Sequence, residues 1–505
     1  MFERILIANR GEIALRVIRT ARELGIECVT VFSDFDRQAL HTRMGHVAVP
    51  LGGNLPSESY LMADKILAAA KETGAEAIHP GYGFLSENAD FARAVTEAGL
   101  AWIGPPPRAI EVMGDKIESR RAMEAAGVPL VPGQTDPAES PEAAAAAAQE
   151  IGMPVALKAA AGGGGKGIRI VREADEVESA FRTASGEAQS AFGDGRLYVE
   201  RYLDNPRHIE IQVLFDGQGN AVHLGERECS IQRRHQKLLE ECPSPTIDAG
   251  TRARMGEVAL QAGAAVDYEG AGTVEFLYSG GEFFFLEMNT RLQVEHPITE
   301  MVTGIDLVAE QLRVAAGEPL GYGQDAIPMN GHAIEVRINA EDVPAGFLPA
   351  TGTVRNLRLP GGPWVRVDSC LYNGLEVGLN YDPMLAKVIV WGPDRAVAIE
   401  RMRRALEELN VGGVRTSAPA ALAVLEEQPF REGDYDTHFL EALDLSSPEG
   451  PEEQLAAALA AVHRFHRARR RAMGADGGER TGWLARSRET TSDYRRRAAR
   501  HGGQA

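Results

Sequence analysis

Short apolar runs alternate with helical patterns near the N-terminus, and this alternation limits the folds that the chain can adopt. The apolar runs are RILIA (4–8), ECVTVFS (27–33), AEAIHP (75–80) and AWIGP (101–105), and the helical patterns cover 12–25, 59–74 and 86–99, the last with Ser86 as its N-cap. Strands that alternate with helices predict a parallel sheet with helices on both faces. The first region is therefore expected to be an α/β domain.

Polar and glycine-rich segments follow two of these strands. NRGE (9–12) and HPGYGFLSEN (79–88) stand at the carboxyl ends of predicted strands, where such sheets gather their ligands. Gly81 and Gly83 begin a pattern that resembles a dinucleotide fingerprint, but Ser86 stands in place of its third glycine. This departure excludes a Rossmann-type NAD site.

The rest of the chain changes character more than once, as expected for a chain of 505 residues, which is too long for a single core. Extended runs separated by turn signals such as DGQGN predict antiparallel strands over 197–300, and a mixed α+β region follows. SSPEGPEEQ, from residue 446, has the composition of a linker. We therefore expect domains at 1–114, 115–330 and 331–445 and a tail at 446–505.

Composition excludes several classes of protein. A net charge of −19 argues against general nucleic-acid binding, although the segment after residue 450 is rich in arginine. No apolar stretch approaches the ~20 residues that span a bilayer, and the first residues lack the layout of a signal peptide. Cys28, Cys229, Cys242 and Cys370 have no metal-binding spacing, which predicts reduced thiols and a cytoplasmic protein.

The segment KAAAGGGGKG (158–167) resembles a P-loop but departs from it at three points. Ala160 stands at the first required glycine, Gly167 follows the lysine in place of Ser or Thr, and the next residues, IRIVRE, alternate as a strand. What remains is a glycine-rich hairpin loop whose N–H groups can approach phosphates closely, with Lys158 adding a positive charge. A surface hairpin without a ligand is the alternative.

Two glutamates interrupt apolar runs in GTVEFLYSGGEFFFLEMN (272–289). Glu275 and Glu287 are equidistant from Gly281, so a hairpin that turns there sets them opposite each other, and Asn289 follows on the face of Glu287. A buried carboxylate is unfavourable by several kcal/mol unless it is paired or bound to a metal. Two carboxylates with an amide oxygen suit Mg²⁺ that bridges phosphates. A glutamate pair neutralised by arginine is the alternative.

Further charged residues surround this hairpin in the sequence. Arg291, Gln293 and Glu295 recur with period two, so they face one side if the chain stays extended. An arginine beside a glutamate suits a small planar anion and a base. CSIQRRHQKLLEE (229–241) adds Gln232, Arg233, Arg234, His235 and Lys237. This basic run either forms a solvated face or neutralises phosphates or an anion near the hairpin.

Together these segments resemble the biotin carboxylase component of the biotin-dependent carboxylases, within the ATP-grasp superfamily. The resemblance covers residues 1–445 and rests on IANRGEIALR, HPGYGFLSEN, MGDK, KAAAGGGGKG, NPRHIEIQV, QRRHQK, GTVEFL, EMNTRLQVEHPITE and EVRINAED, in this order. It implies an N-terminal parallel α/β domain, an ATP-grasp domain with a mobile lid at about 131–203, and a C-terminal mixed α+β domain.

The resemblance also implies roles for single residues. ATP would be held by Lys116, Lys158, Gly164, Gly165, Glu200, Arg201, Tyr202, Leu203, His208, Gln232, His235, Glu275 and Glu287. Mg²⁺ or Mn²⁺ would bind Glu275, Glu287 and Asn289, and bicarbonate would bind Lys237, Arg291, Gln293 and the backbone of Val294. Glu295 would deprotonate bicarbonate, and Arg337 would stabilise the enolate-like oxygen of biotin.

The implied reaction is carboxylation of biotin N1 by ATP and bicarbonate through carboxyphosphate. The chain contains no AMKM tetrapeptide, and its last lysine is Lys387, so we expect biotin on a separate carrier protein, with carboxyltransferase partners that select the acceptor, and a homodimer within that complex. Another ATP-grasp ligase is disfavoured by QRRHQK and EVRIN, which supply contacts to bicarbonate and biotin. The full set of charged site residues disfavours a non-catalytic scaffold.

The tail lies beyond the resemblance. LAAALAAVHRFHRARRRA places Leu455, Leu459, Val462 and His466 on one face of a helix with arginine beyond. This pattern predicts a helix at 453–472 that docks on another protein of the complex, with a contact extended through Trp483. A disordered basic end is the alternative.

Overall fold

The computed structural model describes residues 1–134, 136–159 and 168–445, together with Leu459 and Val462. Residues 1–445 form one compact unit, and residues 446–505 form a second. Gly164 and Gly165 of the predicted phosphate loop lie outside the described residues, as does the predicted docking helix at 453–472 except for Leu459 and Val462. Every other residue assigned above to the site belongs to the first unit.

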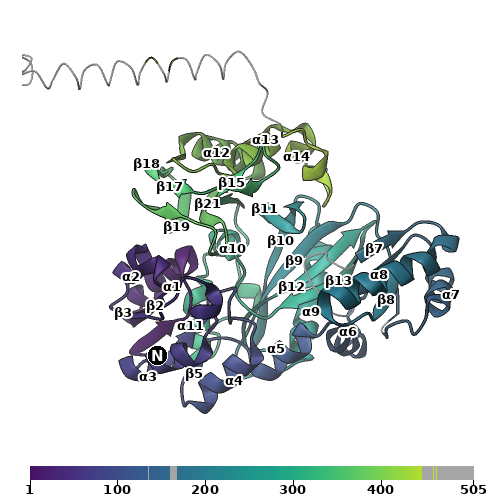
Figure 1. Cartoon of the computed structure of the whole chain (residues 1–505), viewed down its shortest axis with the longest axis horizontal. Coiled ribbons are helices and arrows are strands. Elements are labelled where there is room, and N and C mark those ends of the chain that lie inside the picture. The colour runs from purple at the N-terminus through teal and green to yellow at the C-terminus, as the bar shows by residue number, and fades with distance from the viewer. Residues whose placement is uncertain (135, 160–167, 446–458, 460–461, 463–505) are drawn as a thin grey trace, which may run out of the picture. The chain divides into compact units, whose positions relative to one another are not determined.

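A five-stranded parallel sheet forms the N-terminal part of this unit (Figure 1). Its order is β3-β2-β1-β4-β5, with β1 (Arg4–Ile7), β2 (Glu27–Phe32), β3 (Val47–Pro50), β4 (Ala77–His79) and β5 (Ala101–Trp102). Helices α1 (Gly11–Glu23), α3 (Ala63–Thr73) and α4 (Ala89–Glu97) connect the strands. The predicted parallel α/β architecture is confirmed. β3 was not predicted, because this edge strand is largely exposed and has no clear apolar pattern.

Helix α4 begins later than predicted. Asn88, not Ser86, is its N-cap, and the side-chain oxygen of Asn88 accepts a hydrogen bond from the Phe91 N–H at 2.8 Å. The Ser86 N–H instead donates to the Gly83 carbonyl at 3.0 Å, within a tight turn. The Ser86 prediction was wrong because asparagine caps a helix as well as serine does, and here the turn leaves the capping position to Asn88.

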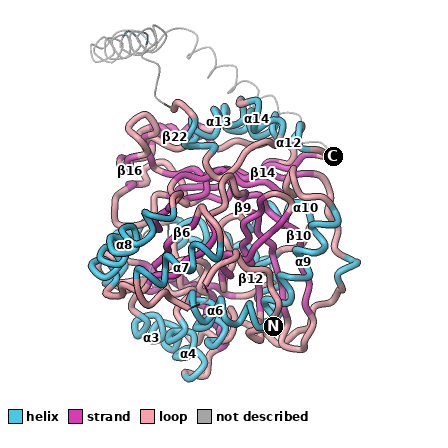
Figure 2. The backbone as a smooth tube through the Cα atoms, turned by 90° about the vertical axis from the view of Figure 1, so that its right-hand side faces the viewer, coloured by secondary structure: helices cyan, strands magenta, loops and turns pink. Residues whose placement is uncertain are grey.

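An eight-stranded antiparallel sheet runs through the middle of the unit (Figure 1 and Figure 2). Its order is β13-β12-β9-β10-β11-β14-β21-β19, with β9 (Arg207–Phe215), β10 (Ala221–Arg233), β11 (Gln236–Cys242), β12 (Gly270–Ser279), β13 (Glu282–Asn289), β14 (His332–Asn339), β19 (Val365–Ser369) and β21 (Met384–Gly392). Because β11 pairs with β14, the sheet continues across the expected boundary at residue 330. β11 was missed because its glutamates, Glu240 and Glu241, resemble surface residues although both are buried.

A separate three-stranded sheet, called the lid sheet below, forms within the segment that the resemblance assigns to the lid. Its order is β7-β6-β8, with β6 (Val155–Ala159), β7 (Ile168–Val171) and β8 (Leu197–Arg201), and helices α7 (Pro141–Ile151) and α8 (Val177–Phe192) belong to the same region. β6 and β7 pair antiparallel. The chain therefore continues as a strand from Ile168, as the alternation in IRIVRE predicted.

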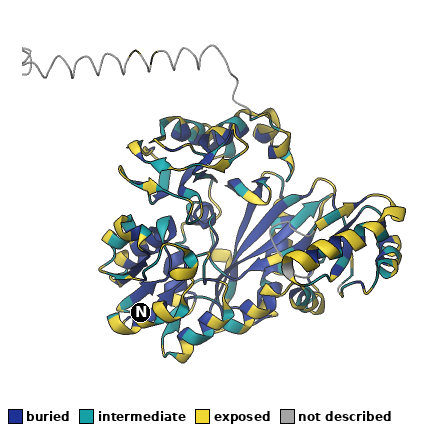
Figure 3. Cartoon of the chain, viewed as in Figure 1, coloured by how far each residue is buried: buried dark blue, intermediate teal, exposed yellow. Residues whose placement is uncertain are grey.

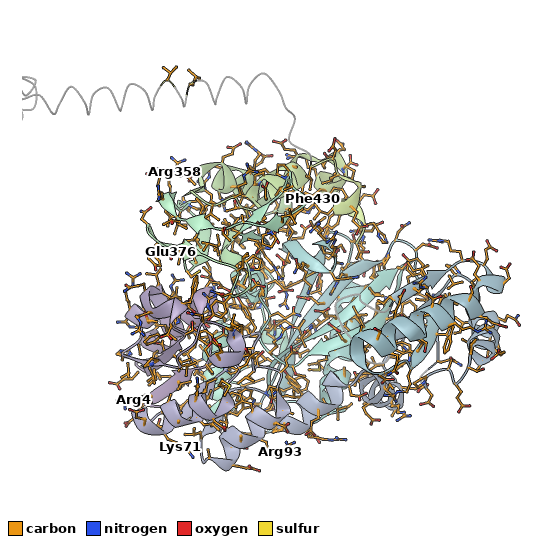
Figure 4. All side chains as sticks on the ribbon, viewed as in Figure 1. Arg4, Lys71, Arg93, Arg358, Glu376 and Phe430 are labelled. Atoms are coloured by element: carbon orange, nitrogen blue, oxygen red, sulfur yellow. The ribbon has the colours of Figure 1, made fainter. Side chains whose placement is uncertain are left out.

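Helices pack on the large sheet with their apolar faces inward. α12 (Arg395–Glu408) lies against β14 and β21 and buries Ala398, Ile399, Met402, Ala405 and Leu406, which share one helical face. Figure 3 shows this arrangement throughout the unit, with buried strands and helices whose outer faces are exposed. Phe430 is fully buried beside these helices, whereas the side chains of Arg358 and Glu376 lie on the exterior (Figure 4).

The other α-helices and strands of the unit are α2 (Leu40–Met44), α5 (Pro107–Gly114), α6 (Lys116–Ala125), α9 (Ala249–Ala264), α10 (His296–Thr303), α11 (Leu307–Ala315), α13 (Ala418–Glu426), α14 (Gln428–Glu432), β15 (Glu341–Asp342), β16 (Leu348–Pro349), β17 (Gly352–Thr353), β18 (Arg355–Arg358), β20 (Glu376–Val377) and β22 (Asn410–Gly412). Within the part of the chain that the structure describes, no helix combines the length and the apolar character needed to cross a membrane.

Candidate active site

A cavity of about 1280 Å³ opens among the N-terminal loops, the lid sheet and the large antiparallel sheet. The loops that follow β1 and β4 contribute residues 9–13, 82–84 and 87 to its wall, as expected for the carboxyl ends of parallel strands. The described residues that the sequence assigned to the site all line this cavity: Lys116, Lys158, Glu200, Arg201, Tyr202, Leu203, His208, Gln232, His235, Lys237, Glu275, Glu287, Asn289, Arg291, Gln293, Val294, Glu295 and Arg337.

A row of four charged residues crosses the large sheet beneath the cavity. Arg227 on β10 pairs with Glu210 on β9, Glu210 pairs with Glu275 on β12, and Glu275 pairs with Glu287 on β13. Directly opposed residues of neighbouring strands point to the same face. Three carboxylates therefore lie side by side, with one buried guanidinium at the end of the row.

The predicted opposition of Glu275 and Glu287 depends on a β-bulge. Nearer the turn, Ser279 pairs with Glu282 and Phe276 pairs with Phe285, and this register would place Leu286 opposite Glu275. A register shift between Glu275 and Phe276 inserts Leu286 as an extra residue and brings Glu287 into line. No feature of the sequence indicated this bulge.

The two glutamates have different surroundings. Oε1 of Glu275 accepts hydrogen bonds from Lys237 at 3.0 Å, Asn289 at 2.8 Å and Gln293 at 2.7 Å. Oε2 of Glu275 lies 2.8 Å from Nε2 of His208, and although burial opposes it, this carboxylate raises the pKa of His208. Burial opposes the ionisation of Glu275, but Lys237 and His208 hold the pKa of this carboxyl well below its usual range.

Glu287 opens into the cavity and, among the described residues, forms no recorded hydrogen bond or ion pair. The enclosing walls, together with the charge of Glu275, raise the pKa of Glu287. A divalent cation between these carboxylates would remove their repulsion, and the neighbouring amide oxygen of Asn289 would complete a set of hard oxygen ligands. The residues present therefore fit Mg²⁺ or Mn²⁺.

Lys237, Glu295 and Arg337 form a compact ionic cluster. Nζ of Lys237 lies 2.7 Å from Oε1 of Glu295, and Nη2 of Arg337 lies 2.9 Å from Oε2 of Glu295. Burial disfavours the Glu295 carboxylate, but Lys237, Arg337 and Arg227 hold the pKa of Glu295 far below the usual range. Lys237 also contacts Glu210 at 2.7 Å, and Arg337 contacts Glu240 at 2.6 Å. The cluster therefore presents an ionised carboxylate between two cations.

Arg227 and Glu210 organise this cluster and were missed by sequence reasoning. The Arg227 side chain is fully buried and donates to Glu210 at 2.5 Å, Gln212 at 2.7 Å and Thr299 at 3.0 Å. Its Nη2 also donates to Thr273 at 3.1 Å and to Gln293 at 3.3 Å. A charge within the strand GERECSIQ was the available signal, because an arginine on a buried strand must be paired.

Arg291, Gln293 and Glu295 reach the cavity from a bent segment. The chain does not stay extended here, because β13 ends at Asn289 and α10 begins at His296, with Glu295 as its N-cap residue. Nε of Arg291 donates to Glu87 of the N-terminal domain at 2.9 Å, and its Nη2 donates to Asn289 at 2.9 Å. Glu87 was not predicted as a site residue, since only the fold brings it beside Arg291.

The remaining predicted residues lie on the lid side of the cavity. Lys158 on β6 and Glu200 on β8 form an ion pair, and Arg120 lies 3.7 Å from Glu200. Arg234 and His235 form the turn between β10 and β11 with positive φ angles of 49° and 65°. The cations Lys158 and Arg120 and the strand β8 thus face the acidic row across the cavity. This arrangement suits a nucleoside triphosphate and its metal.

Comparison with known proteins identifies the family. The model "Biotin carboxylase, N-terminal domain" matches residues 1–110, "Carbamoyl-phosphate synthase L chain, ATP binding domain" matches 115–322, and "Biotin carboxylase C-terminal domain" matches 335–442. A biotin carboxylase from Nostoc sp. is 50% identical over 444 residues, which cover 88% of this chain and 99% of the relative. The propionyl-CoA carboxylase alpha chain from Ruegeria pomeroyi is 48% identical over 93% of this chain and 73% of the relative.

Solved structures agree with this assignment. The biotin carboxylase domain dimer of 2-oxoglutarate carboxylase from Hydrogenobacter thermophilus, in complex with MgADP, ADP and bicarbonate, superposes with a TM-score of 0.83 at 48% identity, covering 87% of this chain and 97% of that chain. The regions that the family models match include every described residue that the sequence assigned to the site. The chain belongs to the biotin carboxylase family and is an ATP-dependent enzyme that carboxylates biotin with bicarbonate.

Proposed function

We propose that the cavity holds ATP, metal, bicarbonate and biotin through the residues named above. The observation that carries this proposal is the contact of Glu295 with both Lys237 and Arg337 beside the Glu275–Glu287 pair. ATP binds along the lid side, at Lys116, Lys158, Glu200, Arg201, Tyr202, Leu203, His208, Gln232 and His235, with Gly164 and Gly165 covering its phosphates.

Glu275, Glu287 and Asn289 bind Mg²⁺ or Mn²⁺, which supplies positive charge to the ATP phosphates. The support for this role is the repulsion between the two opposed carboxylates, which a cation relieves. Glu275 keeps its contacts with Lys237 and His208, so it also joins the metal to the bicarbonate-binding residues.

Bicarbonate binds beside Glu295, at Lys237, Arg291, Gln293 and the N–H of Val294. In this structure both cations of the cluster neutralise Glu295, which makes it a weak base. A bound anion would draw Lys237 away from Glu295 and raise the proton affinity of that carboxylate. Glu295 can then accept the bicarbonate proton as the substrate oxygen attacks the γ-phosphorus of ATP, giving carboxyphosphate and ADP.

Arg337 acts in the second half of the reaction. Carboxyphosphate breaks down to CO₂ and phosphate, the phosphate accepts the N1 proton of biotin, and N1 then forms a bond to the carbon of CO₂. Negative charge develops on the ureido oxygen of biotin as N1 loses its proton, and a fixed guanidinium in an enclosed site stabilises such charge by several kcal/mol. The Arg337 side chain is only 15% exposed and lines the cavity, which supports this assignment.

The test is bicarbonate-dependent release of ADP, measured with and without free biotin. Release that requires bicarbonate and rises with biotin supports these roles. Release that is indifferent to biotin would favour another ATP-grasp ligase. Arg337→Ala is the decisive variant, because it must lower the biotin-stimulated rate more than the basal rate.

We further propose that the biotin is carried by a separate carrier protein and that carboxyltransferase subunits complete the complex. The relative from Ruegeria pomeroyi supports an assembly of several chains, because it is called the alpha chain of a carboxylase. The four cysteines are free thiols, which supports a reducing compartment such as the cytoplasm. Co-purification of this chain with a biotinylated protein from its own cells tests the partner.

The enzyme is also proposed to form a homodimer, as does the relative from Hydrogenobacter thermophilus. Trp364 offers a candidate contact, because 58% of this large apolar side chain is exposed while its ring lies against that of Trp391, with 4.8 Å between centroids. Sedimentation of the wild type and of Trp364→Arg tests this face. A dimer unchanged by the substitution would place the interface elsewhere.

A further inference from the structure

The bicarbonate-binding segment, Gln293–Glu295, is held from behind by two buried side chains that do not line the cavity. His296 is the first residue of α10, and Lys387 lies on β21. Both are 0% exposed, and neither belongs to the cavity wall, whereas Gln293, Val294 and Glu295 do. Both side chains therefore contact the segment without forming part of the cavity wall.

His296 holds the peptide group between Gln293 and Val294. Its Nδ1 lies 2.8 Å from the Gln293 carbonyl oxygen, and its backbone N–H lies 3.4 Å from the same oxygen. A carbonyl can only accept, so Nδ1 carries the proton. Burial lowers the pKa of His296 well below its usual value, which favours the neutral ring, and the contact with the carbonyl then favours the tautomer with its proton on Nδ1.

This contact fixes the direction of the Val294 N–H. The carbonyl of Gln293 and the N–H of Val294 belong to one planar trans peptide, so they point in opposite directions. Because His296 binds the carbonyl oxygen of Gln293, the Val294 N–H of the same peptide points away from His296. Among the described residues no acceptor is recorded for this N–H, which leaves it available to a ligand.

Lys387 holds the next peptide group. Its Nζ donates to the Val294 carbonyl at 2.7 Å, and this peptide leads directly to Glu295. The same ammonium lies 3.6 Å from Oε2 of Glu12 on α1 and 5.8 Å from the ring centre of Tyr82. One buried lysine therefore ties the segment to the N-terminal domain.

We propose that His296 and Lys387 are positioning residues for bicarbonate, each orienting one of two consecutive peptide groups that carry the Val294 N–H and the Glu295 side chain. This inference rests on the proposed role of the Val294 N–H in binding bicarbonate. It assigns a role in bicarbonate affinity to two residues that never touch the substrate. It also explains why a neutral histidine and a charged lysine are buried behind the segment.

The side chains of asparagine and glutamine separate positioning from packing at residue 296. The amide nitrogen of asparagine replaces histidine Nδ1, whereas that of glutamine replaces Nε2. His296→Asn should keep the bicarbonate KM within about threefold of the wild type, and His296→Gln should raise it roughly tenfold, the effect of one lost hydrogen bond. The KM for ATP should stay unchanged in both.

Lys387 requires a paired design, because Lys387→Met leaves the buried carboxylate of Glu12 without its cation. Adding Glu12→Gln removes that charge and should recover thermal stability. The double variant should nevertheless keep a raised bicarbonate KM. Recovery of both stability and bicarbonate KM would show that Lys387 acts only on folding and would overturn its positioning role.

Two controls make the outcomes distinct. His41 is also fully buried, and its Nε2 lies 3.3 Å from the Val31 carbonyl, far from the segment in sequence. His41→Asn, whose amide nitrogen does not replace Nε2, should change stability without changing the bicarbonate KM. Equal bicarbonate KM values for His296→Asn and His296→Gln would overturn the inference for His296. If Arg291→Ala also left this KM unchanged, the proposed bicarbonate site itself would be wrong.

Discussion

Arg337 donates to Glu295 at 2.9 Å, so the guanidinium that we assign to biotin is bound to the carboxylate that we assign to bicarbonate. In the proposed mechanism, bicarbonate activation and biotin carboxylation therefore share one ion pair. Before bicarbonate is activated, Arg337 lowers the basicity of Glu295. After proton transfer, Glu295 is neutral and Arg337 is released to meet the developing charge on biotin. This order couples biotin recognition to completion of the first step.

The first prediction concerns Arg337→Ala. It should lower the carboxylation of free biotin by about a hundredfold, the usual effect of removing one oxyanion donor, and should change biotin-independent ATP cleavage much less. Both rates are measured with the same enzyme preparation. Because the change leaves Glu240 unpaired, Arg337→Ala/Glu240→Gln is the matched variant. Equal losses in the two assays would move Arg337 into the ATP step.

The second prediction separates Glu287 from Glu275. Each Glu→Gln change should lower ATP cleavage by roughly a hundredfold or more, because a metal ligand is lost. Glu287→Gln should leave the thermal midpoint equal or higher, since it removes a repelling charge. Glu275→Gln should lower the thermal midpoint, since His208 loses its carboxylate partner and Lys237 loses one of its three. If either variant cleaved ATP at nearly the wild-type rate with Mg²⁺, the substituted glutamate would not be a metal ligand.

Sequence patterns predicted the parallel N-terminal sheet and the antiparallel hairpin of Glu275 and Glu287, whereas many residues of the cavity wall were assigned only through the family resemblance. The sheet and the hairpin were predictable because apolar periodicity and turn residues are local signals. The eight-stranded sheet was harder to predict from the sequence, since the pairing of β11 with β14 joins residues about a hundred positions apart. The bulge at Leu286 was equally hidden, because no glycine or proline marks it.

The residues that support the ligand-binding side chains were the hardest to predict from the sequence. Arg227 and Glu87 look like ordinary surface residues in the sequence, and only tertiary packing brings them to Gln293 and Arg291. The bend after Asn289 was also missed, because Arg291, Gln293 and Glu295 happen to follow strand periodicity. Their shared destination in the cavity was still predicted, since charge in a segment that follows a buried strand points to a ligand site.

The third prediction tests Arg227. Arg227→Met should reduce the free energy of unfolding by about 3–5 kcal/mol, because Glu210 is then a buried carboxylate that keeps only Lys237 as a cation partner. The midpoint of denaturant unfolding measures this loss. Arg358→Met, at an exposed position on β18, is the control and should have little effect. An Arg227→Met protein as stable as the wild type would show that the row of carboxylates does not depend on the Arg227 guanidinium for its stability.

The fourth prediction concerns acid stability. Burial opposes ionisation of Glu241, but His332 and Arg395 lower the pKa of this carboxyl from 4.5 to about 2. A depressed carboxyl pKa stabilises the fold above the unfolded value, and this contribution, about 3 kcal/mol, disappears as the pH falls from about 5 toward 2. Glu241→Gln should therefore be less stable than the wild type at pH 7 and lose less stability between pH 6 and pH 4. Exposed Glu257→Gln should follow the wild type.

The last prediction concerns the tail. Truncation after Leu445 should leave carboxylation of free biotin nearly unchanged, because every proposed site residue belongs to the unit that ends there. It should weaken assembly with the carrier or carboxyltransferase partner. Leu459 and Val462, which the structure describes, are helical and expose 60% and 52% of their surface, as expected for residues that dock on another protein.

Full-length and truncated chains are compared by co-purification at low and high salt, with Leu459→Asp/Val462→Asp as the matched variant. An arginine-rich contact should weaken as salt shortens the Debye length below ~10 Å, whereas the apolar contact should persist. The double variant should therefore lose assembly at both salt concentrations. Assembly of the truncated chain as complete as that of the full chain would show that 446–505 makes no contact with these partners.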